Sequence, residues 1–396
     1  MTKLELANID VAGKRVIVRV DFNVPIQDGK ITDETRITAA LPTLLDLIHR
    51  NARIILITHL GRPTVGSAAD RRELSTEPIA VALSRKLGTR VAHVNDCIGE
   101  DVQNAVESLE NGEILLLENV RFYAEETDND PEFAQQLASL ADVYVNDAFG
   151  TAHRAHASTE GITHHVTTCA AGLLMAREIH YLSMSLENPA RPYVAILGGA
   201  KISDKITLID NLLGKVDSLL IGGGMAYTFL AAMGVSIGNS LVETDKLDVA
   251  ESLIKKKGFS NTVLLPVDHI AGKEFDPETQ FAVVDEEFIP DGWQGLDIGP
   301  KTIALFRAQI ASAKTVVWNG PLGVYEFEKF AKGTIEVAKQ IASSDAVSII
   351  GGGDCVAAIQ QAGVADRITH VSTGGGASLE FLEGKPLPGI TALTDK

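Results

Sequence analysis

The chain has 396 residues, of which 45% are hydrophobic, and a formal net charge of −17. This length exceeds the size at which one hydrophobic core keeps growing, so we expect two domains. The negative charge argues against nucleic acid or an anionic membrane as a partner, because both are bound through positive fields. Arginines that gather locally would therefore serve a small anion.

The three cysteines are Cys97, Cys169 and Cys355, and they lack the short spacing of metal ligands. This usage is typical of a reducing compartment and predicts no disulfide framework. Residues 1–10 lack the apolar core of a signal peptide, so we expect a cytoplasmic protein.

Short β-branched runs alternate with amphipathic stretches along the whole chain. This pattern predicts an α/β protein with doubly wound parallel sheets covered by helices on both faces. The strands are expected at 15–20, 53–58, 90–94, 114–117 and 143–146 in the first half, and at 193–197, 218–221, 262–266, 315–318, 346–350 and 370–372 in the second. Residues 218–242 carry no charge and have the length of a membrane span, but glycines interrupt them. A buried strand followed by a buried helix is the better interpretation of that segment.

Prolines mark two boundaries along the chain. Pro189 and Pro192 deny helix continuation after a helix predicted over 172–186. Pro386 and Pro388 predict an extended, non-helical tail that must dock elsewhere on the protein. We therefore expect a first domain at 1–171, an interdomain helix at 172–186, a second domain at 187–380 and a tail at 381–396.

Basic side chains follow the predicted strands of the first half. Arg62, Arg121 and Arg154 each come shortly after a strand end, and Arg36 lies in the first turn of a helix expected to be capped by Asp33. Carboxyl ends of parallel strands share one edge of a sheet, so these guanidinium groups are expected to converge on one carboxylate or phosphate. Each arginine taken alone is as well explained by a surface ion pair.

The same loops carry Asp21 and three histidines. Asp21 would accept a hydrogen bond from a substrate hydroxyl, or cap a turn. His59, His153 and His156 raise the rival idea of a zinc site, but no cysteine or paired carboxylate stands at ligand spacing beside them. We interpret the histidines as neutral donors to a phosphate or hydroxyl group.

Glycines punctuate the strand ends of the second half, at 198–199, 222–224, 351–353 and 374–376. The first pair is predicted to open a helix capped by Ser203, where Lys201 and Lys205 can reach the same phosphates. One isolated pair would be only a tight turn, but four junctions favour a nucleotide site. The chain has neither GxxxxGK[ST] nor GxGxxG, which argues against a P-loop NTPase and against a nicotinamide-dependent oxidoreductase.

Three further features of this half could contact a nucleotide. Asp354 stands at a helix start, where it would reach Mg²⁺ on the phosphates or act as an N-cap. Glu326 would accept from ribose hydroxyls, or be a solvated acid. Residues 374–376 would form an anion-binding concavity at another helix N-terminus.

These motifs, in this order, resemble those of the phosphoglycerate kinase family over essentially the full chain. The matching stretches are RVDFNVP at 19–25, HLGRP at 59–63, DAFGTAHRAH at 147–156, GGAKISDK at 198–205, WNGPLGVYE at 318–326, GGGD at 351–354 and STGGG at 372–376. The resemblance implies two Rossmann-like domains joined by a hinge, with the tail returning to the first domain. It also implies a hinge-bending, usually monomeric, glycolytic enzyme that transfers the acyl phosphate of 1,3-bisphosphoglycerate to MgADP, giving 3-phosphoglycerate and ATP.

The resemblance implies a role for each candidate residue. In the first domain, 3-phosphoglycerate would be held by Asp21, Phe22, Asn23, Arg36, His59, Leu60, Gly61, Arg62, Arg121 and Arg154. In the second, the nucleotide would be held by Lys201, Gly222, Gly223, Asn319, Glu326, Gly351, Gly352, Gly353 and Asp354, with Asp354 on Mg²⁺. The transferring group would be surrounded by Arg36, Lys201, Lys205, Gly374 and Gly375. The alternative function is a non-catalytic nucleotide or sugar-phosphate binding protein on the same fold.

Cys355 departs from the family pattern, in which a threonine or serine follows the aspartate. A hydroxyl cap is lost there. A thiol at a helix N-terminus can have a lowered pKa, so we expect Cys355 to be sensitive to alkylation and protected by MgADP.

Overall fold

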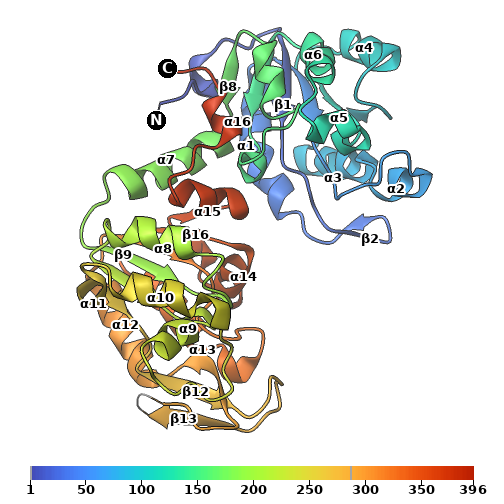
Figure 1. Cartoon of the computed structure of the whole chain (residues 1–396). Helices are drawn as coiled ribbons and strands as arrows, with labels where there is room; N and C mark the ends of the chain where they lie inside the picture. The colour runs from blue at the N-terminus through green and yellow to red at the C-terminus, as the bar shows by residue number, and fades with distance from the viewer. Residues whose placement is uncertain (1, 286–287) are drawn as a thin grey trace. The chain divides into compact units, whose positions relative to one another are not determined.

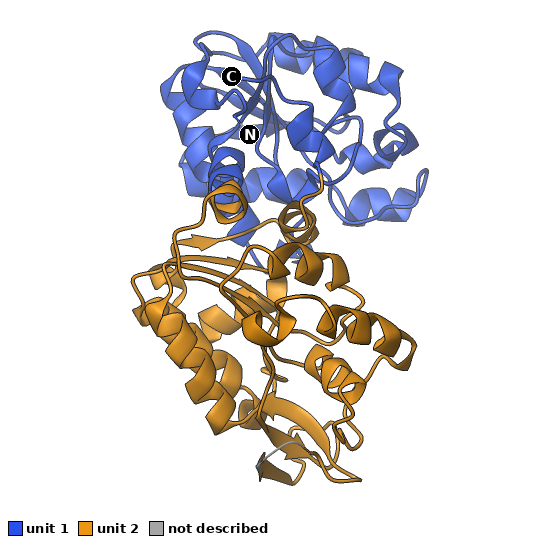
Figure 2. Cartoon of the chain, turned by 60° about the vertical axis from the view of Figure 1, so that its left-hand side comes forward, with its two compact units in different colours: residues 1–180, 386–396 blue, residues 181–385 orange. Residues whose placement is uncertain are grey.

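The structure is a computed structural model of the whole chain, and it describes residues 2–285 and 288–396. It divides into two units (Figure 2): unit 1 comprises residues 1–180 and 386–396, and unit 2 comprises residues 181–385. The division falls inside α7 (Leu173–Glu187), which begins in unit 1 and ends in unit 2.

Unit 1 is built on a six-stranded parallel sheet with the order β5-β6-β4-β1-β7-β8. Its strands are β1 (Arg15–Arg19), β4 (Arg53–Ile57), β5 (Val91–His93), β6 (Ile114–Leu116), β7 (Val143–Asn146) and β8 (Cys169–Ala171). A separate hairpin pairs β2 (Ile26–Gln27) with β3 (Lys30–Ile31). The helices around the sheet (Figure 1) are α1 (Thr35–His49), α2 (Ala68–Glu73), α3 (Glu77–Leu87), α4 (Glu100–Glu107), α5 (Ala124–Thr127), α6 (Pro131–Ser139) and α16 (Pro388–Thr391).

Unit 2 contains a second six-stranded parallel sheet, with the order β11-β10-β9-β15-β16-β17. Its strands are β9 (Tyr193–Leu197), β10 (Ser218–Ile221), β11 (Val263–Leu264), β15 (Thr315–Asn319), β16 (Val347–Gly351) and β17 (His370–Val371). Its helices are α8 (Ile206–Leu213), α9 (Met225–Ala232), α10 (Leu247–Ile254), α11 (Phe259–Thr262), α12 (Pro300–Ser312), α13 (Lys332–Ser343), α14 (Gly353–Gln361) and α15 (Gly376–Leu382). A small antiparallel sheet, β13-β12-β14, joins β12 (Asp268–Gly272), β13 (Phe281–Asp285) and β14 (Gln294–Ile298).

The central strands are buried on both faces, which explains why they read as continuous apolar runs. In β1, Val16 and Val18 belong to the same core cluster as Ile37 and Leu44 of α1, while Ile17 between them is also fully buried. All the strands predicted for the parallel sheets are confirmed within two residues at either end. The sequence did not reveal β8, because its Cys-Ala-Ala stretch has no β-branched residue, and it did not reveal the small antiparallel sheet.

Strand order places a topological switch point in each unit. In unit 1, β1 pairs on one side with β4, the next strand of this sheet along the chain, and on the other side with β7, a later strand. In unit 2, β9 lies in the same way between β10 and β15. Ligands in open parallel sheets bind beyond the carboxyl ends of strands at such points. The segments after β1 and β7, and those after β9 and β15, are therefore where a site is expected in each unit.

Three local predictions require comment. The tail is not wholly extended, because Pro388 opens the short helix α16, and proline is tolerated in a first turn, where its missing N–H costs nothing. Ser203 is not a helix cap, since α8 begins only at Ile206. Residues 218–242 form β10 and α9, as expected, and within the described residues no helix is both long and apolar enough to cross a membrane.

The tail packs on unit 1 and is fixed by hydrogen bonds to it. Asn146 at the end of β7 donates its side-chain N–H to the carbonyl oxygen of Gly389 at 3.0 Å, and the Gly389 N–H donates to Ala152 at 2.8 Å. Lys3 forms an ion pair with Asp395 at 2.7 Å. The predicted return of the tail to the first domain is thus confirmed.

Candidate functional site

The segments that follow β1 and β4 carry interlocking polar groups. Asp21, after β1, forms an ion pair with Arg36 in the first turn of α1. The side-chain oxygen of Asn23 accepts the N–H of Gly61 at 2.9 Å, and Arg121 donates to the Gly61 carbonyl oxygen at 2.7 Å. Residues distant in sequence are therefore brought together at this edge of the sheet.

Two apolar members of the predicted set support this arrangement from within. Phe22 and Leu60 are buried. The Phe22 N–H donates to the Thr58 hydroxyl at 3.0 Å, and the Leu60 N–H donates to the Asn119 side-chain oxygen at 3.1 Å. Their side chains do not carry recognition chemistry, but their backbones hold the two loops in place.

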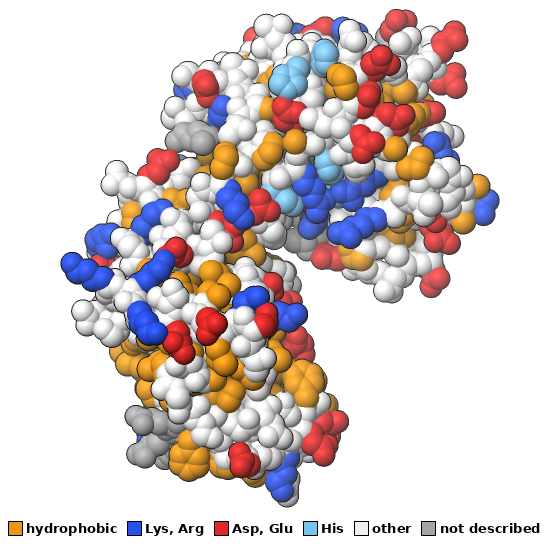
Figure 3. Space-filling model, in the orientation of Figure 1, with side chains coloured by type: hydrophobic (Ala, Val, Ile, Leu, Met, Phe, Trp, Pro, Cys, Tyr) orange, Lys and Arg blue, Asp and Glu red, His pale blue; other side chains and the backbone are white. Residues whose placement is uncertain are grey.

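Beside these loops lies a cavity of about 490 Å³, whose lining includes Arg62, Arg121, Arg154 and His156. The space-filling view shows Lys and Arg side chains gathered with His on the corresponding face of unit 1 (Figure 3). In the described part of the chain, no carboxylate lies within ion-pair distance of the three arginines. The buried Nε of Arg121 also has no hydrogen-bond partner. The cavity therefore concentrates positive charge that no described carboxylate neutralises through an ion pair with these arginines.

Burial and the crowding of positive charges lower the pKa values of several groups around this cavity. Burial, followed by the neighbouring positive charges of Arg154 and Arg19, lowers the pKa of Arg121 to about 10. Burial, followed by the charges of Arg121 and Arg19, lowers the pKa of His156 to about 4. Burial, followed by the charges of Arg19 and Arg121, holds the pKa of His59 well below its usual value. Both imidazoles are thus neutral at pH 7, as the interpretation of neutral donors requires.

In unit 2 the strand ends meet through their backbones. The Gly198 N–H donates to Asn319 at 3.0 Å, and the Gly199 N–H donates to Pro321 at 2.8 Å. A Cβ at Gly198 would overlap the carbonyl oxygen of Pro321, and one at Gly320, whose φ is +93°, would overlap Gly198. Only glycine allows the loops after β9 and β15 to approach this closely.

One side of this junction carries Lys205 and Asn319. Lys205 is buried and donates to the side-chain oxygen of Asn319 at 2.5 Å, while the buried Nδ2 of Asn319 has no partner. Lys201, by contrast, is exposed. Gly222 is buried and Gly223 has a φ of +68° beside Gly199. Together these residues form a loop cluster with one free buried donor and two lysines.

Two helix N-termini open nearby in unit 2. A Cβ at Gly353, in α14, or at Gly375 and Gly376, at the start of α15, would meet nothing within 4 Å. Gly351 and Gly352 lie against the Asn319 side chain, and the Gly374 N–H donates to Ser372 at 3.2 Å. The open space over these termini leaves room for a ligand to approach backbone N–H groups.

The acidic candidates of unit 2 are Asp354 and Glu326, both exposed. Burial raises the pKa of Tyr325, and so do the charges of Asp354 and Glu326, which places the two carboxylates near the same phenol. In the described residues no group of three or more His, Cys, Asp or Glu side chains could hold a metal ion. A lone exposed carboxylate at a helix start fits an Mg²⁺ ion that is carried mainly by phosphate oxygens.

Cys355 does not behave as expected. It is fully buried in α14, and burial raises the pKa of its thiol rather than lowering it. Its sulfur accepts the N–H of Gly320 at 2.9 Å. The expectation of a reactive thiol at a helix N-terminus is therefore wrong, because the side chain points into the core instead of toward solvent.

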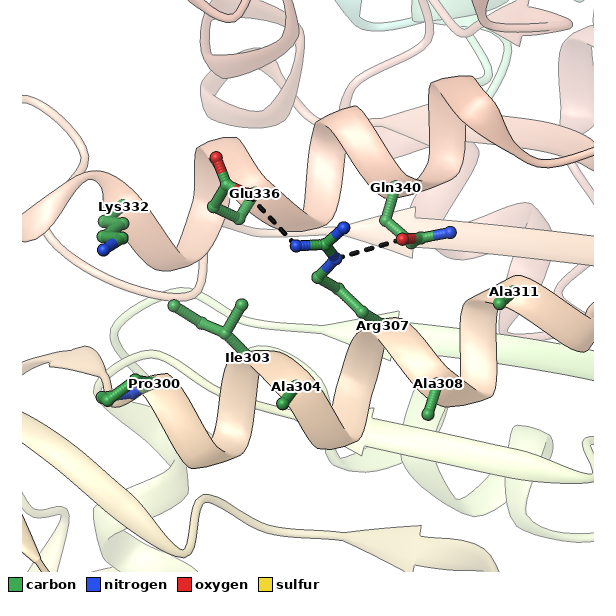
Figure 4. Close-up of a pocket in the computed structure, with 9 residues that line it drawn as sticks. All are labelled: Pro300, Ile303, Ala304, Arg307, Ala308, Ala311, Lys332, Glu336 and Gln340. Carbon is green, nitrogen blue, oxygen red and sulfur yellow. Dashed lines mark hydrogen bonds and ion pairs between the residues drawn. The ribbon is translucent and has the colours of Figure 1, made fainter.

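A larger groove in unit 2 carries none of the predicted site residues. It has a volume of about 640 Å³ and lies between α12 and α13 (Figure 4). Arg307 of α12 crosses it to Glu336 at 3.4 Å and to Gln340 at 3.1 Å on α13. Its size alone does not make it the site.

Sequence reasoning missed several residues that shape these sites. Three of them are buried in unit 1: Arg19, which contacts His59, and Glu126 and Ser158. In unit 2, Glu243 accepts hydrogen bonds from the Ser203 N–H at 3.1 Å and from the Ser203 hydroxyl at 2.6 Å. Arg19 could have been found, because it directly precedes the segment of Asp21. The two glutamates gave no signal, since an acid in a short polar stretch reads as solvent-exposed.

Comparison with known proteins extends the resemblance. Residues 6–385 match the family described as phosphoglycerate kinase. A phosphoglycerate kinase of Moorella thermoacetica is 55% identical, with 100% of each chain covered, and one of Clostridium tetani is 53% identical over 100% of this chain and 98% of its own. The solved phosphoglycerate kinase of Coxiella burnetii superposes with a TM-score of 0.91 at 44% identity, covering 98% of each chain.

Proposed function

This chain belongs to the phosphoglycerate kinase family, and from that premise we propose how its residues divide the reaction. The activity is phosphoryl transfer between a nucleotide and a carboxyl group: 1,3-bisphosphoglycerate gives its acyl phosphate to ADP, and 3-phosphoglycerate accepts it back from ATP. The reading as a non-catalytic binding protein has no support from these relatives.

We assign 3-phosphoglycerate to the arginine-lined cavity of unit 1. The observation that carries this assignment is the set of Arg62, Arg121 and Arg154 around about 490 Å³, without carboxylate partners among the described residues. Guanidinium forks bind phosphate and carboxylate oxygens bidentately. Neutral His59 and His156 add donors that do not depend on pH near 7.

The nucleotide is assigned to the glycine junctions of unit 2. Its phosphates would lie over the N-termini of α14 and α15, where N–H groups and helix dipoles favour anions. Lys201 and Lys205 would contribute charge, and the free Nδ2 of Asn319 would gain a partner. Glu326 would accept from the ribose.

Asp354 would hold the Mg²⁺ that comes with the nucleotide. When bound, that ion neutralises phosphate charge. The other side chains bind and orient. The acceptor carboxylate is ionised at neutral pH, since its unperturbed pKa is about 4, so no general base is needed. This explains why two binding surfaces can be sufficient for catalysis without an acid–base dyad.

Phosphoryl transfer needs in-line placement and positive potential around the three equatorial oxygens. Arg36 from unit 1, with Lys201, Lys205 and the amides of Gly374 and Gly375 from unit 2, would supply that potential. We propose that a hinge-bending monomer brings the two ligands together, which also excludes water as an acceptor. The free, buried thiols are in keeping with a cytoplasmic location.

The test is nucleotide consumption. MgATP should be consumed only when 3-phosphoglycerate is present, and not with glycerol 3-phosphate, which has the phosphate but no acceptor carboxylate. Turnover with both compounds, or binding of both ligands without turnover, would contradict the proposal. X-ray scattering with both ligands should show a more compact particle than with either alone, and unchanged curves would remove the closing motion.

A further inference from the structure

We propose that a buried chain of hydrogen bonds, from Glu126 through Ser158 to Arg19, fixes His59 in one tautomer and so presents its Nε2–H to the bound anion. Glu126, Ser158 and Arg19 are positioning residues in this scheme. The inference deepens the proposed substrate site of unit 1 and rests on it for the identity of the anion.

Arg19 is the centre of the chain. It is the last residue of β1, and only 1% of it is exposed. Its Nε donates to the Ser158 hydroxyl oxygen at 2.8 Å, its Nη1 donates to the carbonyl oxygen of Val20, and its Nη2 lies 3.2 Å from Nδ1 of His59. A guanidinium group stays protonated and has only donors. Nδ1 of His59 must therefore offer its lone pair to Arg19.

This contact decides where the histidine proton lies. A neutral imidazole carries one N–H, so when Nδ1 accepts a hydrogen bond the proton is on Nε2. Among the described residues, the competing partner recorded for Nδ1 is Asp21, whose Oδ1 lies 3.9 Å away, beyond hydrogen-bond distance. Burial and four arginines hold the pKa of His59 well below its usual value, so the second proton is not taken up near pH 7. Nε2–H is then the group left for a ligand.

Ser158 and Glu126 hold Arg19 in this position. Because the Ser158 oxygen accepts from Arg19, its own proton is free to donate to Oε1 of Glu126 at 2.7 Å. The Ser158 N–H donates to Oε2 of Glu126 at 2.9 Å, and the Tyr144 hydroxyl donates to the Ser158 carbonyl oxygen at 3.0 Å. Ser158 is thus fixed on three sides, and both carboxylate oxygens of Glu126 are used.

The buried carboxylate also has an electrostatic role. Glu126 is fully buried within a cluster of cations, and its charge raises the pKa of Arg121, opposing the effect of the other arginines. A buried arginine without any negative neighbour would carry a large desolvation cost. Glu126 lies on α5, next to the segment of Arg121, whereas Ser158 follows the segment of Arg154. The hydrogen-bond chain therefore connects three segments of the site: the end of β1, the segment of Arg121 and the segment of Arg154.

The test combines a spectrum with a binding measurement on the full chain. Protein labelled with ¹⁵N-histidine, with His59 assigned through His59→Gln, should show a lone-pair Nδ1 and a protonated Nε2 without ligand. Ser158→Ala should release Arg19, produce a mixture of tautomers and weaken 3-phosphoglycerate binding by about tenfold in calorimetry, the usual value of one charge-assisted hydrogen bond. MgADP affinity should not change.

Controls separate the outcomes. Ser139→Ala, on the exposed face of α6, should leave the tautomer and both affinities unchanged. Glu126→Gln is the second variant, because it replaces one of the two acceptor oxygens that face Ser158 by an NH₂ group, which can only donate. It should have the same effects as Ser158→Ala and serves in its place if that variant does not fold. A protonated Nδ1 in the unaltered protein, or one unchanged tautomer in both variants, would overturn the proposal. The spectrum needs no ligand, so a chain with the expected tautomer that fails to bind 3-phosphoglycerate would refute the substrate assignment and leave the hydrogen-bond chain intact.

Discussion

Units 1 and 2 share an architecture, but their candidate anion sites are built differently. Each has a six-stranded parallel sheet with its candidate site at the carboxyl ends beside a switch point. The candidate site of unit 1 is lined by charged side chains, those of Arg62, Arg121 and Arg154. That of unit 2 has open helix N-termini and a loop junction in which glycine at 198 and 320 allows close approach. We therefore expect the charged side chains of unit 1 to be replaceable with little effect on the backbone, whereas a side chain at Gly198 or Gly320 would push the two loops apart. Variants should therefore separate binding from stability in unit 1 and combine them in unit 2.

The largest effect on the rate is expected from the two cations that we propose to contact the transferring phosphoryl group, Arg36 of unit 1 and Lys201 of unit 2. Lys201→Ala and Arg36→Ala should each lower kcat by two or more orders of magnitude, because one preorganised charge contact to a transition state contributes about 3–4 kcal/mol. Steady-state kinetics measures this, with Lys255→Ala, an exposed residue at the C-cap of α10, as the matched control of near-normal rate. A variant that kept nearly full kcat would remove its residue from the mechanism.

The next effect separates glycine from side-chain recognition. Gly198→Ala should destabilise unit 2 by about 3 kcal/mol, because the new methyl group overlaps the backbone of Pro321 in a packed junction. Urea unfolding followed by fluorescence measures the loss. Gly214→Ala is the control, since a Cβ there meets nothing within 4 Å. Equal stability of the two variants would show that the loops can move apart at no cost.

A smaller effect should be confined to affinity in unit 1. Arg154→Ala should raise KM for 3-phosphoglycerate about 10- to 100-fold, the range for a hydrogen bond to a charged group, and leave KM for MgATP and the unfolding midpoint near their original values. Exposed Arg90→Ala is the control for a general loss of positive charge. If both KM values rose together, the assignment of one ligand to each unit would be wrong.

The smallest effect is a pH dependence of stability from His156. Its pKa falls from the usual 6.5 to about 4 in the folded chain through burial and the neighbouring arginines, so between these values the unfolded state binds more protons. The contribution of His156 to the free energy of unfolding is therefore fully present above about pH 6.5, and it decreases as the pH falls toward 4.

Urea unfolding at pH 7 and pH 5 measures this effect. The difference in free energy of unfolding between the original protein and His156→Gln should shrink at the lower pH, while exposed Ser139→Ala, which removes no titratable group, should show no such trend. Comparing variants is necessary because buried Asp147, with a pKa raised to about 6, changes stability in the opposite direction over part of this range. A constant difference would show that His156 is not held neutral by its surroundings.

The parallel sheets and the candidate residues at their carboxyl ends could be predicted from the sequence. These follow from local signals: apolar β-branched runs specify buried strands, and glycine or arginine directly after a strand marks an edge where a ligand can bind. The order of the motifs is sufficient to indicate the family.

Only the tertiary structure decided which polar side chains are buried and what they face. The thiol of Cys355 points into the core, and Glu126 is enclosed by segments far away in sequence, although both stand in stretches that read as helix starts or solvent-exposed turns. The small antiparallel sheet and the helix within the tail were equally hidden. Burial and the pKa shifts that depend on it arise from atoms contributed by several elements, so no local pattern can specify them.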